Sequence, residues 1–362
     1  MKLWALLFFI MPISGFVYVS WHTWQILPLP SYLRWAVIAL FVIAISCMFF
    51  NFLVGLDNVP MPLARVIYAI GTSSLIIMLY LAMVFLLLDI GKLAHVVPPS
   101  FLKSSLIGSA TITVFMLAVF IYGNVHYYHK YRYEINLKAA KPLSKPVKIL
   151  MMSDLHLGYH NTRADLAKWV GIINAENPDL VLIAGDIVDI STRPLLAENM
   201  EEEFRKIKAP VYACLGNHDY YAAIDKSCSF FKKANIKLLR DSSILFDNEI
   251  TITGRDDRTN KRRKSVEELI SNAPKSKFNI LLDHQPYGLE QAERAGVDFQ
   301  FSGHTHYGQV WPVSWIEDAI YEDAYGPLTK GNTHYYVSSG IGIWGGKFRI
   351  GTRSEYVVVT IK

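Results

Sequence analysis

The sequence predicts a bundle of transmembrane α-helices followed by an α/β domain. The first observation behind this is an uneven distribution of charge. Of 67 charged residues, only seven lie in residues 1–125, in a chain that is 52% apolar with a mean hydropathy of +0.23. The second is that strand-like and helical patterns alternate from residue 146 onward. We therefore expect a helical region over 1–125, a basic juxtamembrane linker over 126–145 and the α/β domain over 146–362.

Four apolar runs predict four membrane spans. They are Leu3–Ser20, Trp35–Leu56, Val66–Leu88 and Ser104–Tyr122. Each approaches the length needed to cross a hydrocarbon core of roughly 30 Å. The first run lacks a cleavage site of small residues, and three more runs follow it, so we interpret it as a retained span rather than a signal peptide. No run has a central charge, which argues against a transporter and favours an anchor.

Basic residues predict the side of the membrane. Lys2 and Arg65 fall on one side together with a cluster that directly follows the last span: Lys130, Arg132, Lys138, Lys141, Lys145 and Lys148. Arg34, Lys92 and Lys103 fall on the other side. Because basic loops stay in the cytoplasm, we expect the α/β domain there. The cluster serves as a topology signal, and binding of anionic lipid head groups is the alternative.

Composition excludes two classes. Beyond residue 125 the chain balances 31 basic against 29 acidic residues, so no nucleic-acid-binding domain is evident. Three cysteines without paired spacing form neither a disulfide framework nor a metal knuckle. The lipid bilayer is the partner that the composition indicates.

The α/β domain opens with a buried strand and continues in alternation. In order we predict a strand at Val147–Met152, a helix at Thr162–Glu176, a strand at Leu180–Ala184, a helix closing at Phe204–Lys208, and strands at Val211–Leu215, Phe278–Leu282, Asp298–Phe301 and His334–Ser338. This alternation is typical of an α/β fold.

Polar residues come immediately after the ends of five of these strands. The five segments are Ser153-Asp154-Leu155-His156, Gly185-Asp186-Ile187-Val188-Asp189, Gly216-Asn217-His218-Asp219, Asp283-His284 and Ser302-Gly303-His304-Thr305-His306. Strand carboxyl ends converge on the ligand crevice of an α/β sheet. Five unpaired polar clusters at buried strand ends would be costly without a ligand. Carboxylate, amide and imidazole ligands suit manganese, iron, zinc or magnesium, and there are enough of them for two ions.

Taken together, these five blocks resemble the calcineurin-like metallophosphoesterase family, and the resemblance extends over 146–362. It implies two β-sheets sandwiched between helices in four αββα layers, and two divalent ions, manganese first among them. Asp154, His156 and His306 would hold one ion. Asn217, His284 and His304 would hold the other, with Asp186 between them.

The resemblance also implies a reaction. A hydroxide that bridges the two ions would attack a phosphate ester or anhydride in line. His218 would protonate or stabilise the leaving oxygen, and Asp219 would orient His218. Asp189 would support its loop.

Other residues have two interpretations each. His160 would contact substrate or lie in an exposed loop, and Arg349 would bind phosphate oxygens or lie at the surface. The charged run 255–264 is a solvated loop or a phosphate-facing cap. The apolar run Val310–Ile316, with Trp311 and Trp315, packs in the core or forms a membrane-dipping rim beside the site.

Three functions follow. The first is a membrane-anchored phosphohydrolase acting on a lipid-linked phosphate, such as the pyrophosphate of UDP-diacylglucosamine. The second acts on a soluble nucleotide or phosphoester, with the spans only fixing its location. The third is a non-catalytic membrane scaffold, which would normally lack a metal ligand, and none is missing here.

Overall fold

The computed structural model describes residues 3–139, 143–271, 273–274 and 276–362, with the backbone alone for residues 3–11. The chain divides into two compact units. One comprises Met1–Asn124 with Gly345–Lys347, and the other comprises Val125–Trp344 with Phe348–Lys362. The predicted contributions of Lys2 and Lys141 to membrane topology lie outside the described residues.

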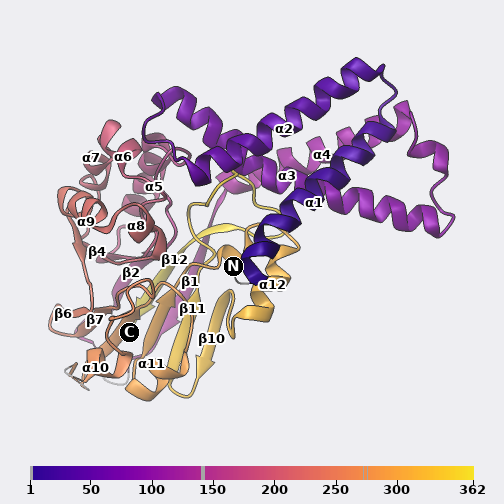
Figure 1. Ribbon diagram of the computed structural model, residues 1–362. Coiled ribbons are helices and arrows are strands. Elements are labelled where there is room, and N and C mark those ends of the chain that lie inside the picture. The colour runs from indigo at the N-terminus through magenta and orange to yellow at the C-terminus, as the bar shows by residue number, and fades with distance from the viewer. Residues whose placement is uncertain (1–2, 140–142, 272, 275) are drawn as a thin grey trace. The chain divides into compact units, whose positions relative to one another are not determined.

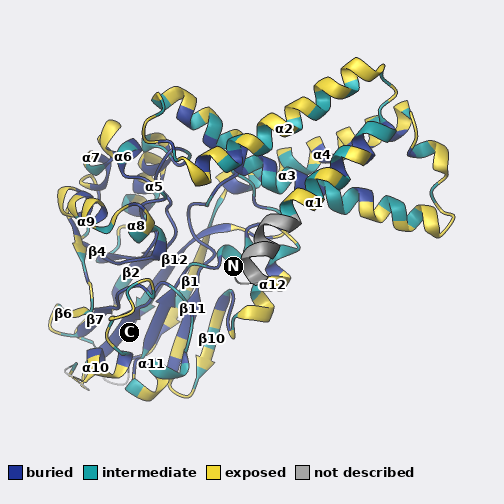
Figure 2. Ribbon diagram, viewed as in Figure 1, coloured by how far each residue is buried: buried dark blue, intermediate teal, exposed yellow. Residues whose placement is uncertain are grey.

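The first unit is helical. Its elements are α1 (Leu3–Ile26), α2 (Ser31–Leu53), α3 (Met61–Leu93), η1 (Pro99–Phe101) and most of α4 (Leu106–Tyr128). Helices α2, α3 and α4 are long and apolar enough to cross a membrane. Their apolar side chains are widely exposed, as lipid contact requires (Figure 2). The predicted span Leu3–Ser20 is helical within α1, and its crossing of the membrane stays a prediction.

The first sheet of the second unit has six strands. In spatial order they are β1 (Lys130–Leu137), β12 (Ser354–Ile361), β2 (Val147–Met152), β3 (Leu180–Ala184), β4 (Val211–Cys214) and β5 (Ile236–Leu238). Strands β2 to β5 run parallel, and β12 is antiparallel to β2. The parallel strands therefore end at one edge of the sheet.

The second sheet also has six strands. In order they are β10 (Gly326–Lys330), β11 (Thr333–Val337), β9 (Phe299–Ser302), β8 (Phe278–Leu282), β7 (Ile250–Gly254) and β6 (Ser242–Phe246). Strands β11, β9, β8 and β7 are parallel, and the two outer strands are antiparallel to their neighbours. Parallel strands buried on both faces are apolar along most of their length, which explains why β3, and β8 with its single polar residue Asn279, are recognisable in the sequence.

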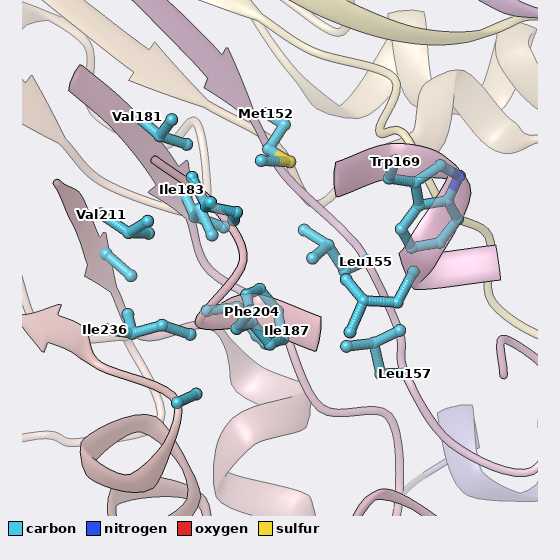
Figure 3. Packing of buried hydrophobic residues seen from close by; sticks show 14 of the residues in the cluster. Met152, Leu155, Leu157, Trp169, Val181, Ile183, Ile187, Phe204, Val211 and Ile236 are labelled. Carbon is cyan, nitrogen blue, oxygen red and sulfur yellow. The ribbon is translucent and has the colours of Figure 1, made fainter. Parts of the chain in front are cut away.

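Helices cover the outer faces of both sheets (Figure 1). The helices of this unit are α5 (Arg163–Glu176), α6 (Arg193–Ala197), α7 (Met200–Phe204), α8 (Asn217–Tyr221), α9 (Ile224–Lys233), α10 (Val266–Ile270), α11 (Glu290–Ala295), η2 (His306–Gly308) and α12 (Val313–Ile320). On the first sheet, Trp169 of α5 and Phe204 of α7 belong to the same buried cluster as Ile183 of β3 (Figure 3). On the second, Val266 of α10 packs with Leu281 of β8.

A separate apolar core lies between the sheets. It joins strand residues of the first sheet, such as Leu182 and Val357, to Ile252 and Ile280 of the second. Each such side chain contributes roughly 1.5–3 kcal/mol on burial. The four-layer αββα arrangement is thereby confirmed.

Two predicted segments are wrong in part. Residues 130–137, assigned to the linker, form β1, which pairs in parallel with β12. This partner lies more than 200 residues away, so nothing local to the run revealed the pairing. The helix predicted to close over Phe204–Lys208 ends at Phe204, and Pro210 follows shortly after, consistent with a helix ending before a proline.

Candidate metal and phosphoester site

The predicted site residues come from loops at the ends of strands in both sheets. Asp154 and His156 follow β2, and Asp186 and Asp189 follow β3. Asn217 and His218 begin α8, directly after β4. His284 follows β8, and His304 and His306 follow β9. The parallel direction of these strands therefore delivers all five sequence blocks to one place.

The backbone of this site is held in an unusual conformation. Five of the seven predicted metal ligands have a positive φ: Asp154 at 56°, His156 at 43°, Asp186 at 52°, His304 at 74° and His306 at 49°. Residues with a side chain avoid this left-handed region, and each such residue costs of order 1–3 kcal/mol. Such strain persists where the surrounding structure enforces it, and it is concentrated at functional sites.

The first cluster consists of Asp154, His156 and His306. Nε2 of His156 lies 3.0 Å from Nε2 of His306, and the same His306 atom lies 3.5 Å from Oδ1 of Asp154. Both carboxylate oxygens of Asp154 accept a hydrogen bond from the backbone N–H of His304, each at 3.1 Å. Two imidazole nitrogens and a carboxylate oxygen therefore converge on one point.

The second cluster consists of Asp186, His284 and His304. Oδ2 of Asp186 lies 3.1 Å from Nε2 of His284, and it also lies 3.6 Å from Nε2 of His156 in the first cluster. Its other oxygen accepts a hydrogen bond from the His218 amide at 2.8 Å. Asp186 thus stands between the two clusters, in the position predicted for a shared carboxylate.

The donor set fits two divalent ions. His284 donates from Nδ1 to the Ala184 carbonyl at 2.7 Å, so Nε2, which faces Asp186, is the ring atom available to an ion. Oδ1 of Asn217 is buried and accepts no hydrogen bond from any described residue. A buried amide oxygen without a partner is costly unless a ligand satisfies it.

The electrostatics agree with this fit. Burial lowers the pKa of His304 to about 4 and that of His306 to about 3, so both rings are neutral, which is the form that binds metal. Burial also disfavours the charged form of His156, but Asp154 and Asp189 outweigh it and raise its pKa to about 10. The carboxylates therefore favour a positive charge at this position, and a divalent ion supplies one.

A glycine makes room for the shared carboxylate. A Cβ on Gly216 would collide with Oδ1 and the backbone nitrogen of Asp186. No side chain is therefore tolerated there without moving Asp186. This explains why glycine precedes Asn217 in the sequence.

The partner of His218 differs from the one expected. Oδ1 of Asp189 lies 3.2 Å from Nδ1 of His218 and 3.3 Å from Nδ1 of His156. The prediction that Asp219 orients His218 is wrong. The Asp219 carboxylate instead accepts backbone N–H groups of Gly216, Val188 and Asp186 at 2.9, 2.9 and 3.1 Å. Asp219 holds the loops, and Asp189 contacts the histidines.

Arg349 is a structural residue, so its predicted contact with substrate is wrong. The side chain is completely buried. Its guanidinium donates to the carbonyls of His306 at 2.7 Å and Gly342 at 3.1 Å, and also to Ser339. Five donors in a rigid fork suit a residue that ties loops together. His160, in the loop that links β2 to α5, is partly buried and belongs to none of the three groups of metal-ligand candidates.

The two tryptophans of the run Val310–Ile316 are exposed although Val310 is buried, so the interpretation of Trp311 and Trp315 as core packing is wrong. Trp311 is 42% exposed and Trp315 is 64% exposed, and Ile316 and Ile320 on α12 are exposed as well. The run directly follows η2, which contains His306, and Tyr307 donates a hydrogen bond to Asp318 of α12 at 3.3 Å. An apolar surface therefore adjoins the loop of the first cluster.

The charged run 255–264 is ordered rather than solvated throughout. Asp256 is buried, and its carboxylate accepts hydrogen bonds from Arg240 and Tyr220. Arg255 and Arg263 both form ion pairs with Asp283. Gln285, next to His284, donates to the buried Asp257 at 2.7 Å. The run is therefore anchored beside the second cluster.

Two arginines of this run, Arg258 and Arg262, form no ion pair with a described carboxylate, and Arg258 is the one that stacks on an aromatic ring. Among the described residues, no carboxylate forms an ion pair with Arg258, whose guanidinium stacks 3.9 Å from the Tyr287 ring. Tyr287 donates to the hydroxyl of Tyr321 at 3.0 Å, and the Tyr321 ring lies 6.3 Å from the His304 ring. We call Arg258, Tyr287 and Tyr321 the arginine–tyrosine rim. In the sequence, the only sign of this rim was that Arg258 belongs to the charged run 255–264.

Sequence reasoning also missed Asn161. This fully buried residue donates to the carbonyls of Leu155, His156 and Ile343 at 3.0 to 3.1 Å. Its own carbonyl accepts the hydroxyl of Tyr127 at 2.8 Å. It fixes the loop that carries His156. A single asparagine outside the five blocks carries no recognisable pattern.

Comparison with known proteins adds the family. A family model described as calcineurin-like phosphoesterase matches residues 147–308. A metallophosphoesterase of Aquifex aeolicus is 33% identical over 233 residues, which cover 61% of this chain and 87% of that protein. A metallophosphoesterase of Campylobacter jejuni is 32% identical over 227 residues, covering 61% of this chain and 60% of its own. A transmembrane protein with a metallophosphoesterase domain from Danio rerio is 29% identical over 234 residues, which cover 60% of this chain and 53% of that protein.

Proposed function

We propose a reaction for this site from the premise that the chain belongs to the calcineurin-like phosphoesterase family, a family of metal-dependent phosphoester hydrolases. The proposed reaction is hydrolysis of a phosphate ester or anhydride with two divalent ions, manganese first among the candidates and iron, zinc or magnesium after it. The observation that carries it is the position of Asp186, whose Oδ2 lies 3.6 Å from His156 and 3.1 Å from His284.

The residues divide the work as follows. When bound, the two ions supply positive charge and an activated water for in-line displacement at phosphorus. Asp154, His156 and His306 would hold one, and Asn217, His284 and His304 the other, with Asp186 shared. His218 gives a proton from its imidazole to the leaving oxygen as the phosphorus–oxygen bond breaks. Asp189 faces Nδ1 of His218 and stabilises the protonated ring.

A simple assay separates an enzyme from a scaffold. The full chain, purified in detergent, is incubated with bis-p-nitrophenyl phosphate and Mn²⁺ beside an Asp186→Asn variant. We expect Mn²⁺-dependent release of p-nitrophenol by the native chain and loss in the variant. Normal folding of the variant is checked by circular dichroism. Absence of hydrolysis by the native chain with each of the four candidate metals would contradict the proposal.

For the substrate, we propose a phosphorylated lipid-linked molecule. The three membrane-capable helices hold the domain at a bilayer. The exposed apolar side chains of α12 adjoin the loop that carries His306, and tryptophan favours the membrane–water interface. This surface supports access to a lipid head group, for example the pyrophosphate of UDP-diacylglucosamine. A soluble nucleotide or phosphoester remains the competing substrate class, because fold and metal site alone do not choose.

An unbiased experiment decides between these classes. Native chain and Asp186→Asn are incubated with a membrane lipid extract and, separately, with a soluble metabolite extract. Mass spectrometry then identifies the phosphorylated species that the native chain alone consumes. Consumption confined to the soluble extract would contradict a lipid-linked substrate while leaving the hydrolase proposal intact.

We further propose that the phosphoesterase domain faces the cytoplasm. Among described residues, Lys130, Arg132, Lys138, Lys145 and Lys148 follow α4 within 20 residues of its end, and such residues are retained on the cytoplasmic side. A reporter fused after Lys362 tests this: activity of a reporter that works only outside the cytoplasm would contradict it.

A further inference from the structure

A pocket of about 500 Å³ lies where α4, β1 and α5 meet. It lies wholly within the second unit. Tyr127 and Tyr128 line it from the last turn of α4, and Lys130 lines it from the start of β1. Lys168 and Trp169 are among the residues that line it from α5. The proposed reaction uses none of these residues.

The position of the pocket is set by the membrane. Helix α4 runs from Leu106 to Tyr128 and is apolar enough to span. A spanning helix ends at the membrane–water boundary, where tyrosine is enriched. Residues of its last turn therefore lie at the level of the lipid head groups, and so does the pocket that they line.

The lining of the pocket is cationic and aromatic. Nζ of Lys130 lies 3.8 Å from the Tyr127 ring centroid and 5.6 Å from that of Trp169. Nζ of Lys168 lies 5.6 Å from the Tyr128 ring centroid, and no carboxylate in the described part of the chain forms an ion pair with it. Lys168 is exposed, whereas Trp169 is buried. The pocket thus offers ammonium groups above an apolar floor.

One carboxylate also lines the pocket. Asp165 belongs to the capping box at the start of α5. Its Oδ2 accepts the Thr162 amide at 3.0 Å and the Thr162 hydroxyl at 3.2 Å. These bonds direct that oxygen to the helix start. One oxygen of this carboxylate is therefore engaged at the helix start, and the Lys130 ammonium itself donates to the Tyr127 carbonyl at 2.7 Å.

We propose that this pocket binds the head group of an anionic phospholipid. The phosphate contacts Lys130 and Lys168, and the upper part of the lipid lies against Trp169 and Ile172, which also line the pocket. Each lysine near an anionic membrane surface strengthens binding about fivefold. A free phosphate ion would use the lysines alone, so the apolar floor and the location at the membrane surface favour the lipid.

The test uses the full chain in a neutral detergent and counts bound lipids by native mass spectrometry. Phosphatidylglycerol is titrated against phosphatidylcholine, with glycerol phosphate as the head group without chains. The double variant Lys130→Ala/Lys168→Ala is compared with Lys232→Ala/Lys233→Ala, two exposed lysines of α9 that lie outside the pocket. We expect one tight phosphatidylglycerol site that weakens tenfold or more in the first double variant only, by roughly fivefold per lysine.

A second variant fills the pocket without removing charge. Gly171 lines the pocket, and no atom lies within 4 Å of where its Cβ would be placed. Gly171→Leu should abolish the tight site while keeping both lysines, and Ala167→Leu, on the exposed surface of the same helix, should not. Equal binding of the two phospholipids, equal binding of glycerol phosphate, or a tight site that survives Gly171→Leu would each overturn the proposal.

Discussion

Oδ1 of Asp189 lies 3.2 Å from Nδ1 of His218 and 3.3 Å from Nδ1 of His156. One buried carboxylate therefore contacts both the proposed proton donor and a proposed metal ligand. Burial raises the pKa of Asp189, but His156 and His218 outweigh it and hold this pKa well below its usual range. Asp189 is thus ionised and able to stabilise charge on either ring.

Replacing Asp189 should therefore weaken catalysis. We expect Asp189→Asn to lower kcat/KM about 10- to 100-fold, as is typical when a carboxylate behind a functional histidine is lost. The loss should be larger for alkyl phosphodiesters than for bis-p-nitrophenyl phosphate, because p-nitrophenolate leaves without a proton. A loss that is the same for both leaving groups would indicate a structural role only.

His218→Ala should lower turnover about 10²- to 10⁴-fold on alkyl phosphodiesters. Metal content, measured by inductively coupled plasma mass spectrometry, should stay near that of the native chain. In the His218→Ala variant, adding Asp189→Asn should lower turnover far less than Asp189→Asn does in the native chain, because the two residues act as a pair. Loss of metal together with activity would contradict the role given to His218.

Asp219→Asn should act on stability. The carboxylate accepts three buried backbone N–H groups, and an amide in its place turns a donor toward at least one of them. We expect a loss of about 1–3 kcal/mol in the free energy of unfolding. Denaturant unfolding measures it, with Asp189→Asn for comparison. An unchanged unfolding midpoint would show that these bonds do not hold the loops.

Trp311→Ser with Trp315→Ser should impair action on lipid substrate in vesicles. Two exposed indoles that enter the interface contribute apolar burial there, so we expect at least about a tenfold loss. Hydrolysis of bis-p-nitrophenyl phosphate should be unchanged, as should both activities of Leu245→Ser, which removes an exposed apolar residue of β6. Equal losses on vesicle and soluble substrates would contradict a membrane-contacting role for α12.

Arg258→Ala should raise KM about tenfold with a smaller change in kcat. A guanidinium without an acidic partner, stacked on Tyr287 at the rim of the second cluster, suits a phosphate of the substrate. Arg258→Lys should recover only part of the affinity, because lysine lacks the planar fork. Arg262→Ala, an exposed residue of the same run, is the control. A KM that stays unchanged would exclude Arg258 from substrate binding.

Much of the fold was predictable because its central strands consist mostly of apolar residues. Val147–Met152 and Leu180–Ala184 are buried on both faces, so their sequences needed no partner to be recognised. Edge strand β1 was missed because it depends on pairing with β12. The paired residues Lys130 of β1 and Ser354 of β12 lie far apart in sequence. Alternating tyrosines after a membrane span resemble an interfacial segment as much as a strand.

The order of motifs along the chain determined the family and the set of metal-ligand candidates, because each ligand type follows a strand end and parallel strands converge. The positions of neighbouring residues in the sequence could not show which carboxylate faces which histidine. Asp219 is the neighbour of His218 in sequence, but the start of α8 directs its carboxylate into the backbone of two loops. The β3 loop brings Asp189 to His218 instead. In the same way, tertiary structure buried Arg349 and exposed Trp315, because burial depends on what packs above a residue and not on its type.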